Sequence, residues 1–249
     1  MKPILMFPIS QRLCIRLCIY LFLVICLLVP LAVQAGPIDL TEFSFNGVAG
    51  DEKVSVKTNN YDGNVRVGYH ELTLDATDDN WSGNYKGFCV EDKVIYQGTY
   101  TNYKLYSVNP STPYEHAAWL MDSYYTDSAP ALQLAIWEAV FDYDDNNGDN
   151  QNNFNFSSGN FQINDYDVND KSYFGQAETY LQALYGQTSL DLTGHYTYKI
   201  ASDDNDLSDD PLGKQDFIVR RPVPIPGALW LLGSGLIGIF YFNRKRTFC

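Results

Sequence analysis

Apolar and polar residues alternate along most of the first half of the chain. The alternation runs from about Phe43 to Tyr106 and is clearest over residues 54–56, 65–74 and 87–108. Stretches rich in Gly, Asn and Asp separate the alternating runs. This pattern predicts antiparallel strands, each with one buried face, joined by turns.

The apolar spacing becomes helical in the second half of the chain. Apolar residues recur three and four positions apart over residues 114–124, 129–142 and 173–185. Ser128 and Pro130 are typical of a helix N-cap and a first helical turn, so they predict where the second helix begins.

Two further alternating segments, residues 195–200 and 215–219, follow the predicted helices. The order of strands, then helices, then strands predicts an α+β fold. We expect an antiparallel β sandwich or barrel with an inserted helical subdomain.

The first 35 residues have the composition of an export signal. Three basic residues precede an apolar run over residues 17–31, and small residues at cleavage spacing end in Ala35. We interpret residues 1–35 as a secretory signal peptide, with an uncleaved membrane anchor as the alternative. In either case the chain leaves the cytoplasm.

Residues 222–249 combine a Pro-rich start, an apolar span and a basic end. The span, residues 227–242, would be about 24 Å long as a helix, compared with about 30 Å for a hydrocarbon core. The basic residues that follow it predict that the C-terminal tail stays inside while the preceding domain lies outside. We therefore expect this segment to contact the membrane.

The segment between the two ends, residues 36–221, has the length of one domain. It holds all 30 acidic residues, and six of the 17 basic residues lie outside it, so its formal charge is −19. Such a charge repels the phosphate backbone, which argues against nucleic acid as a partner.

Two residues of this domain are unusual for their surroundings. Cys89 is the only cysteine between residues 36 and 221, which excludes a disulfide framework there. Gln133 lies within the apolar stretch ALQLAIWEAVF, where an unpaired carboxamide would cost roughly 1 to 3 kcal/mol. Its donors and its acceptor must be satisfied or used.

A cysteine and a glutamine that meet in a folded chain can form an internal thioester. The thiolate of Cys89 would attack the side-chain carbonyl of Gln133 and expel ammonia. The product is an activated acyl group that an amine or an alcohol can open. This chemistry would account for both unusual residues at once.

Both segments resemble the thioester domains of bacterial surface adhesins. That family pairs a cysteine in an aromatic-Cys stretch with the glutamine of a Gln-x-Ala-Ile-Trp motif, and this chain has Phe88-Cys89 and Gln133-Leu134-Ala135-Ile136-Trp137. The resemblance implies that Cys89 is the thioester sulfur and Gln133 the acyl donor, with Ile136 and Trp137 shielding the bond. It also implies covalent attachment to a partner instead of enzymatic turnover.

The C-terminal segment resembles the PEP-CTERM sorting signals of Gram-negative bacteria. It has the Pro-rich motif Val223-Pro224-Ile225-Pro226, without the Glu of the commonest form, and the apolar span and basic end of that signal. The resemblance implies processing by an exosortase-type membrane protease and delivery to the cell surface. A plain C-terminal membrane anchor is the alternative.

A cysteine protease or a transglutaminase would also use a lone cysteine, with a histidine as its base. The candidate bases are His70, His116 and His195. A cysteine on a strand lacks the helix N-terminus that lowers a thiol pKa, and no flanking motif supports turnover. We therefore expect that the protein is not an enzyme.

Acidic loops raise the question of calcium. The run over residues 142–149 places oxygen ligands around Gly148, but its spacing does not fit an EF-hand. A solvated exit from the helix is the simpler interpretation of this run. The same question arises for a second acidic loop: Asp203, Asp204, Asp206, Asp209 and Asp210.

The sequence therefore predicts an exported adhesin of the cell surface or extracellular matrix, without a cofactor or a metal ion. Its expected partner is a surface protein or polysaccharide that carries amine or hydroxyl groups. The alternative is a noncovalent structural or calcium-assisted matrix protein in which Cys89 is a buried thiol.

Overall fold

The fold is taken from a computed structural model. It describes residues 36–50, 52–93, 95–143, 155–164, 171–192, 194–203 and 214–223. The predicted signal peptide, the predicted sorting segment beyond residue 223 and most of both acidic loops lie outside these residues. Within the described ranges, no helix is both long enough and apolar enough to cross a membrane.

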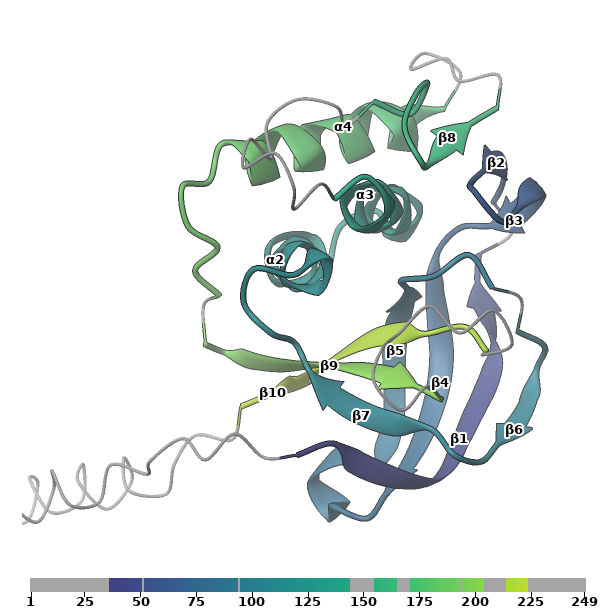
Figure 1. Ribbon diagram of the computed structural model, residues 1–249, viewed down its shortest axis with the longest axis vertical. Helices are drawn as coiled ribbons and strands as arrows, with labels where there is room; N and C mark the ends of the chain where they lie inside the picture. The colour runs from purple at the N-terminus through teal and green to yellow at the C-terminus, as the bar shows by residue number, and fades with distance from the viewer. Residues whose placement is uncertain are drawn as a thin grey trace, which may run out of the picture. The chain divides into compact units, whose positions relative to one another are not determined.

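Six antiparallel strands close into a β-barrel, which confirms the predicted α+β fold and selects the barrel (Figure 1). The barrel strands are β1 (Ile38–Ala49), β4 (Tyr69–Ala76), β5 (Gly83–Cys89), β7 (Lys104–Ser107), β9 (Tyr196–Ser202) and β10 (Phe217–Pro222). The ring closes because β1 pairs with β7 at its start and with β4 along most of its length. A short strand, β6 (Gly98–Tyr100), also pairs with β1.

Three helices are inserted between β7 and β9, as the sequence predicts. They are α2 (Pro113–Tyr124), α3 (Ala129–Phe141) and α4 (Ser172–Tyr185). α2 packs against β9 and β10, α3 packs against β4 and β5, and α4 packs on the other two helices (Figure 1). Ser128 is the N-cap of α3, because its hydroxyl accepts the backbone N–H of Ala131 at 3.4 Å.

A small antiparallel sheet lies outside the barrel. It consists of β2 (Lys53–Lys57), β3 (Asp62–Arg66) and β8 (Gln162–Ile163). A single 3₁₀ turn, η1 (Asp79–Trp81), precedes β5. The alternating run over residues 65–74 is therefore two strands in two sheets.

Gly68 marks the division between these two strands. Its φ of +154° and the carbonyl of Ala49, which would lie 2.4 Å from an added Cβ, leave room only for glycine. The chain can thus leave the small sheet and enter the barrel within two residues.

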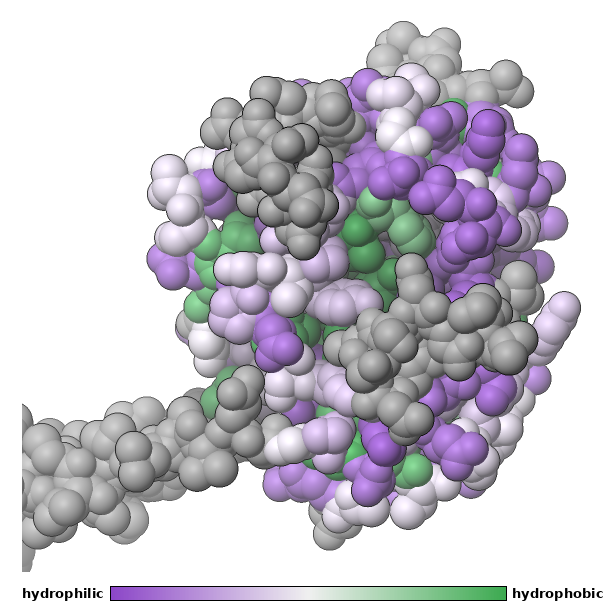
Figure 2. Space-filling view, in the orientation of Figure 1, coloured by the Kyte–Doolittle hydropathy of each residue, from purple (hydrophilic) through white to green (hydrophobic). Residues whose placement is uncertain are grey.

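Aromatic rings fill the barrel. Phe43, Phe45 and Phe217 are buried, and the Phe217 ring stacks on the other two at centroid distances of 5.6 and 6.0 Å. In the view of Figure 2 the described surface is largely hydrophilic, and hydrophobic side chains show mainly in a recess at the level of α3. The core thus continues from the barrel into the space beneath the helices.

Candidate functional site

The site is built around the last residue of β5, Cys89. On one side its strand continues its pairing with β10, where Phe217 lies opposite Cys89 and Val90 N–H donates to Asp216 C=O. On the other side the pairing with β4 ends at His70 and Gly87. The backbone N–H and C=O of Cys89 therefore face a side on which the strand ladder has stopped.

The side chain of Gln133 takes the place of the missing strand. Its Oε1 accepts the Cys89 N–H at 3.0 Å, and its Nε2 donates to the Cys89 C=O at 2.9 Å. Gln133 is fully buried, so these bonds remove the cost of an unpaired carboxamide. The structure thus brings together the two residues singled out in the sequence. The hydrogen bonds of the Gln133 carboxamide are with the backbone of Cys89, not with its thiol.

The thiol of Cys89 contacts a histidine. His70 is buried on β4, and its Nε2 lies 3.1 Å from Cys89 Sγ. Burial lowers the pKa of His70 to about 3 and raises the pKa of the Cys89 thiol well above its usual value. The pair is therefore neutral at pH 7, and the geometry allows the thiol to donate to the imidazole.

The imidazole is held in place by aromatic rings. His70 packs against Phe217 and Phe45 at ring-centroid distances of 5.1 and 5.5 Å. Among the described residues, no side chain other than Cys89 is bonded to its nitrogens. The ring thus has one polar partner, the sulfur.

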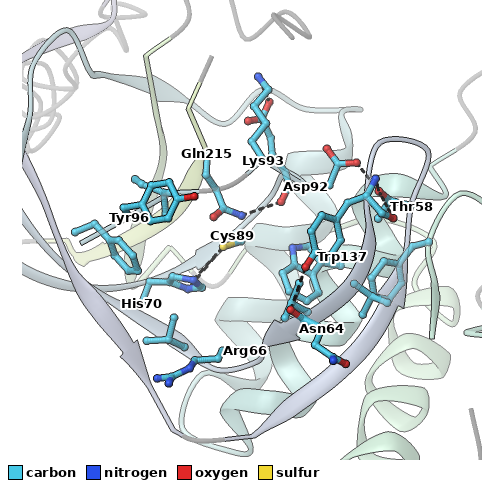
Figure 3. Close-up of a pocket in the computed structure, with 18 of the residues that line it drawn as sticks. Thr58, Asn64, Arg66, His70, Cys89, Asp92, Lys93, Tyr96, Trp137 and Gln215 are labelled. Atoms are coloured by element: carbon cyan, nitrogen blue, oxygen red, sulfur yellow. Dashed lines mark hydrogen bonds and ion pairs between the residues drawn. The ribbon is translucent and has the colours of Figure 1, made fainter. Parts of the chain in front are cut away.

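Cys89 and His70 line a cavity of about 540 Å³. Figure 3 shows both side chains facing this space, with Trp137 from α3 across from His70. Asp92 lines the same cavity and accepts a hydrogen bond from Thr58. A small group that enters the cavity can therefore approach the sulfur, although Cys89 itself is only 1% exposed.

Of the two residues predicted to shield a thioester, one lines the cavity and the other lies in the core. Trp137 is one helical turn after Gln133, lines the cavity and packs its ring 5.7 Å from that of Phe161. Ile136 is fully buried in the core and is not part of the cavity wall. Trp137 is thus placed to limit access to Cys89, whereas Ile136 supports the helix behind it.

The sequence offered three histidines without distinguishing among them. His116 lies on α2 against Tyr143, and burial lowers its pKa to about 4, whereas His195 precedes β9. Of the three, only His70 contacts Cys89 in the described structure. The alternation of His70 with Leu72 and Leu74 already indicated that it faces inward, and this pattern could have selected it.

No protein-family model, curated protein or solved structure matches the chain. Among the described residues, no group of three or more His, Cys, Asp and Glu side chains could hold a metal ion. A function has to be inferred from Cys89, Gln133, His70 and the cavity that they adjoin.

Proposed function

We propose that the protein is an exported adhesin that attaches covalently to its partner through a thioester between Cys89 Sγ and Gln133 Cδ. One observation carries the proposal: the buried Gln133 carboxamide is bonded to both backbone groups of Cys89. This places the acyl carbon beside the residue whose thiol would attack it. Proximity of this kind is the main requirement for an intramolecular acyl transfer.

Formation of the bond uses groups that are already in contact. His70 Nε2 accepts the thiol proton, and the sulfur attacks Gln133 Cδ. Negative charge develops on Oε1, which the Cys89 N–H stabilises at 3.0 Å. The Cδ–Nε2 bond then breaks, the proton is passed on to the leaving nitrogen, and ammonia departs as the C–S bond remains.

Attachment to a partner consumes the thioester. A partner amine enters the cavity and attacks the thioester carbonyl, the C–S bond breaks, and an amide forms at Gln133 while the Cys89 thiol is regenerated. A hydroxyl group would give an ester in the same way. The −19 formal charge of residues 36–221 favours the approach of protonated amines, such as lysine side chains on a surface protein.

The contact between Cys89 and His70 also suggests a cysteine hydrolase, and one feature weighs against it. Among the described residues, no acidic or amide side chain orients His70 as a third member of a triad. We therefore propose that each molecule of the protein reacts once with a partner and does not act as a hydrolase that turns over.

The placement of the protein is part of this proposal. Residues 1–35 would direct export, and residues 222–249 would hold the chain in the membrane until an exosortase-type enzyme processes it. The domain would then act at the cell surface or in the extracellular matrix.

Intact mass measurement of residues 36–223 tests the thioester. We expect a mass about 17 Da below that of the sequence, and methylamine should then raise it to about 14 Da above. Cys89→Ala and Gln133→Ala should show no deficit, whereas Gln187→Ala, an exposed glutamine at the end of α4, should keep it. A full mass, together with one thiol that titrates only after unfolding, would rule out the covalent function.

A further inference from the structure

A second cavity, which we call the side cavity, lies beside the one that Cys89 lines. It has a volume of about 350 Å³ and is enclosed by the turn between β2 and β3, the segment after β5, the start of α2, the end of α3 and the loop before β8. Glu91, Asp92 and Phe141 line both cavities, so the two adjoin. Figure 3 shows Asp92 at the wall of the first cavity, beside Thr58.

The polar groups of the side cavity are carboxamides and carboxylates. The carboxamides belong to Asn59, Asn60 and Asn160, all at exposed positions, and the carboxylates belong to Glu91 and Asp92. Among the described residues that line this cavity there is no Lys, Arg or His. A negatively charged ligand, such as a phosphate or an acidic sugar, is therefore disfavoured.

Hydrogen bonds between distant segments hold these polar groups in place. Asn59 Nδ2 donates to Asn160 Oδ1 at 3.4 Å, and Asn160 Nδ2 donates to the Phe141 C=O at 3.0 Å. Asn60 Nδ2 donates to Asp92 Oδ1, also at 3.4 Å. A carboxamide has two N–H donors and an oxygen with two lone pairs, so each of these groups keeps further donors and acceptors for a ligand.

The rest of the wall is apolar. Tyr114 and Phe141 contribute half-buried aromatic rings, and Val90, Pro113 and Val140 contribute aliphatic groups. A pyranose sugar matches both kinds of surface, because its hydroxyl groups donate and accept hydrogen bonds at the edge while the C–H groups on its faces pack against rings. A peptide backbone has only one donor per residue and makes less use of two carboxylates, which only accept.

We infer that the side cavity binds a neutral pyranose unit of a surface or matrix polysaccharide. Its volume is at the small end of the roughly 300 to 1,000 Å³ of ligand cavities, which suits a single sugar unit. As a statement about the partner, this inference rests on the covalent function proposed above. The bound unit holds its neighbour along the polysaccharide next to the first cavity, where a hydroxyl group approaches the thioester. The hydroxyl oxygen then forms an ester bond with Gln133 Cδ, the C–S bond breaks, and the hydroxyl proton is transferred to the Cys89 sulfur.

A ligand-detected NMR titration of the full chain, in a detergent without a sugar headgroup, tests the inference. The Cys89→Ala variant is used so that no covalent reaction contributes. The probes are glucose, galactose, mannose and N-acetylglucosamine, with triglycine as the peptide probe. We expect at least one sugar to bind with a dissociation constant on the order of 1 mM, as for a ligand of about 12 to 15 non-hydrogen atoms. Added salt should leave this binding unchanged, because the sugar is uncharged.

Asn60→Ala and Tyr114→Ala, each in the Cys89→Ala background, should weaken sugar binding roughly fivefold or more. Asn84→Ala is the control, at an exposed position of β5 that lines neither cavity, and it should leave binding unchanged. If Tyr114→Ala does not fold, Asn60→Ala alone decides.

Three outcomes would overturn the inference: no sugar binds, only triglycine binds, or the substitutions in the side cavity leave sugar binding unchanged. Sugar binding without a mass deficit in the wild type would contradict the thioester alone. A mass deficit without sugar binding would contradict the sugar site alone.

Discussion

The substitution Gln133→Leu, made in a Cys89→Ala background, measures what the glutamine does for the fold when no thioester can form. Leucine has a similar size and keeps the helix, but it leaves the N–H and C=O of residue 89 without partners. Each buried backbone group left unpaired costs about 1 to 3 kcal/mol. Since both are buried at the end of β5, we expect a loss of about 2 to 6 kcal/mol in the free energy of unfolding.

Urea unfolding of residues 36–223, followed by tryptophan fluorescence, provides the measurement. The control is Gln187→Leu in the same background, at an exposed site, where we expect a change within about 0.5 kcal/mol. A loss below about 1 kcal/mol in Gln133→Leu would mean that water or another group replaces the carboxamide, and would refute the account of Gln133 as a substitute for the missing strand.

Three further predictions concern the groups around the site. His70→Leu should slow thioester formation roughly 100-fold or more, measured as ammonia released after refolding; an unchanged rate would exclude His70 as the proton acceptor. The pKa of Glu138 rises from 4.5 to about 9 on folding, so its contribution to stability is complete below about pH 4.5 and is lost as the pH rises towards 9. Glu138→Gln should therefore gain stability relative to the wild type as the pH rises, and parallel pH profiles in urea unfolding would contradict this. Gly159→Ala should lower the free energy of unfolding by more than the roughly 1 to 3 kcal/mol expected from backbone strain alone, because the added Cβ also clashes with Asp142. Gly83→Ala introduces similar backbone strain at a φ of +140°, but nothing lies near the added Cβ, so it should destabilise the protein less. Equal losses of stability in the two variants would show that the clash with Asp142 contributes nothing.

The local patterns of the sequence predicted most of the secondary structure. The helical period located the three helices to within about one residue at each end, and Ser128 identified the start of α3. The alternating runs marked the regions that form strands but not the ends of each strand, because β1 begins at Ile38, before the alternation becomes clear, and the run over residues 87–108 covers parts of β5, β6 and β7. The helices and the regions that form strands depend on neighbours in the chain, so periodicity and capping chemistry are sufficient to find them.

Contacts between segments that are distant in the chain were harder to predict from the sequence. The sequence left open a sandwich or a barrel, because the closing pair of β1 with β4 depends on register and not on composition. The pairing of β8 with β2 joins segments about a hundred residues apart, and no local pattern indicates it. The division at Gly68 required knowledge of the Ala49 carbonyl.

The candidate site was predicted in part. The apolar surroundings of Gln133 and the isolation of Cys89 marked both residues, and the structure brings them together. The choice of His70 among three histidines, and the burial of Glu138 with Asp142, depend on tertiary packing. A charged residue in an apolar helix was visible in the sequence, but its complete burial was not.

Peptide mapping after methylamine treatment tests the central proposal most directly, because it locates both ends of the bond. The account predicts a methylamide on Gln133, and a Cys89 thiol that iodoacetamide modifies in the unfolded protein only after methylamine treatment. It would be contradicted by an unmodified Gln133 together with a Cys89 thiol that iodoacetamide modifies equally in unfolded protein never exposed to the amine.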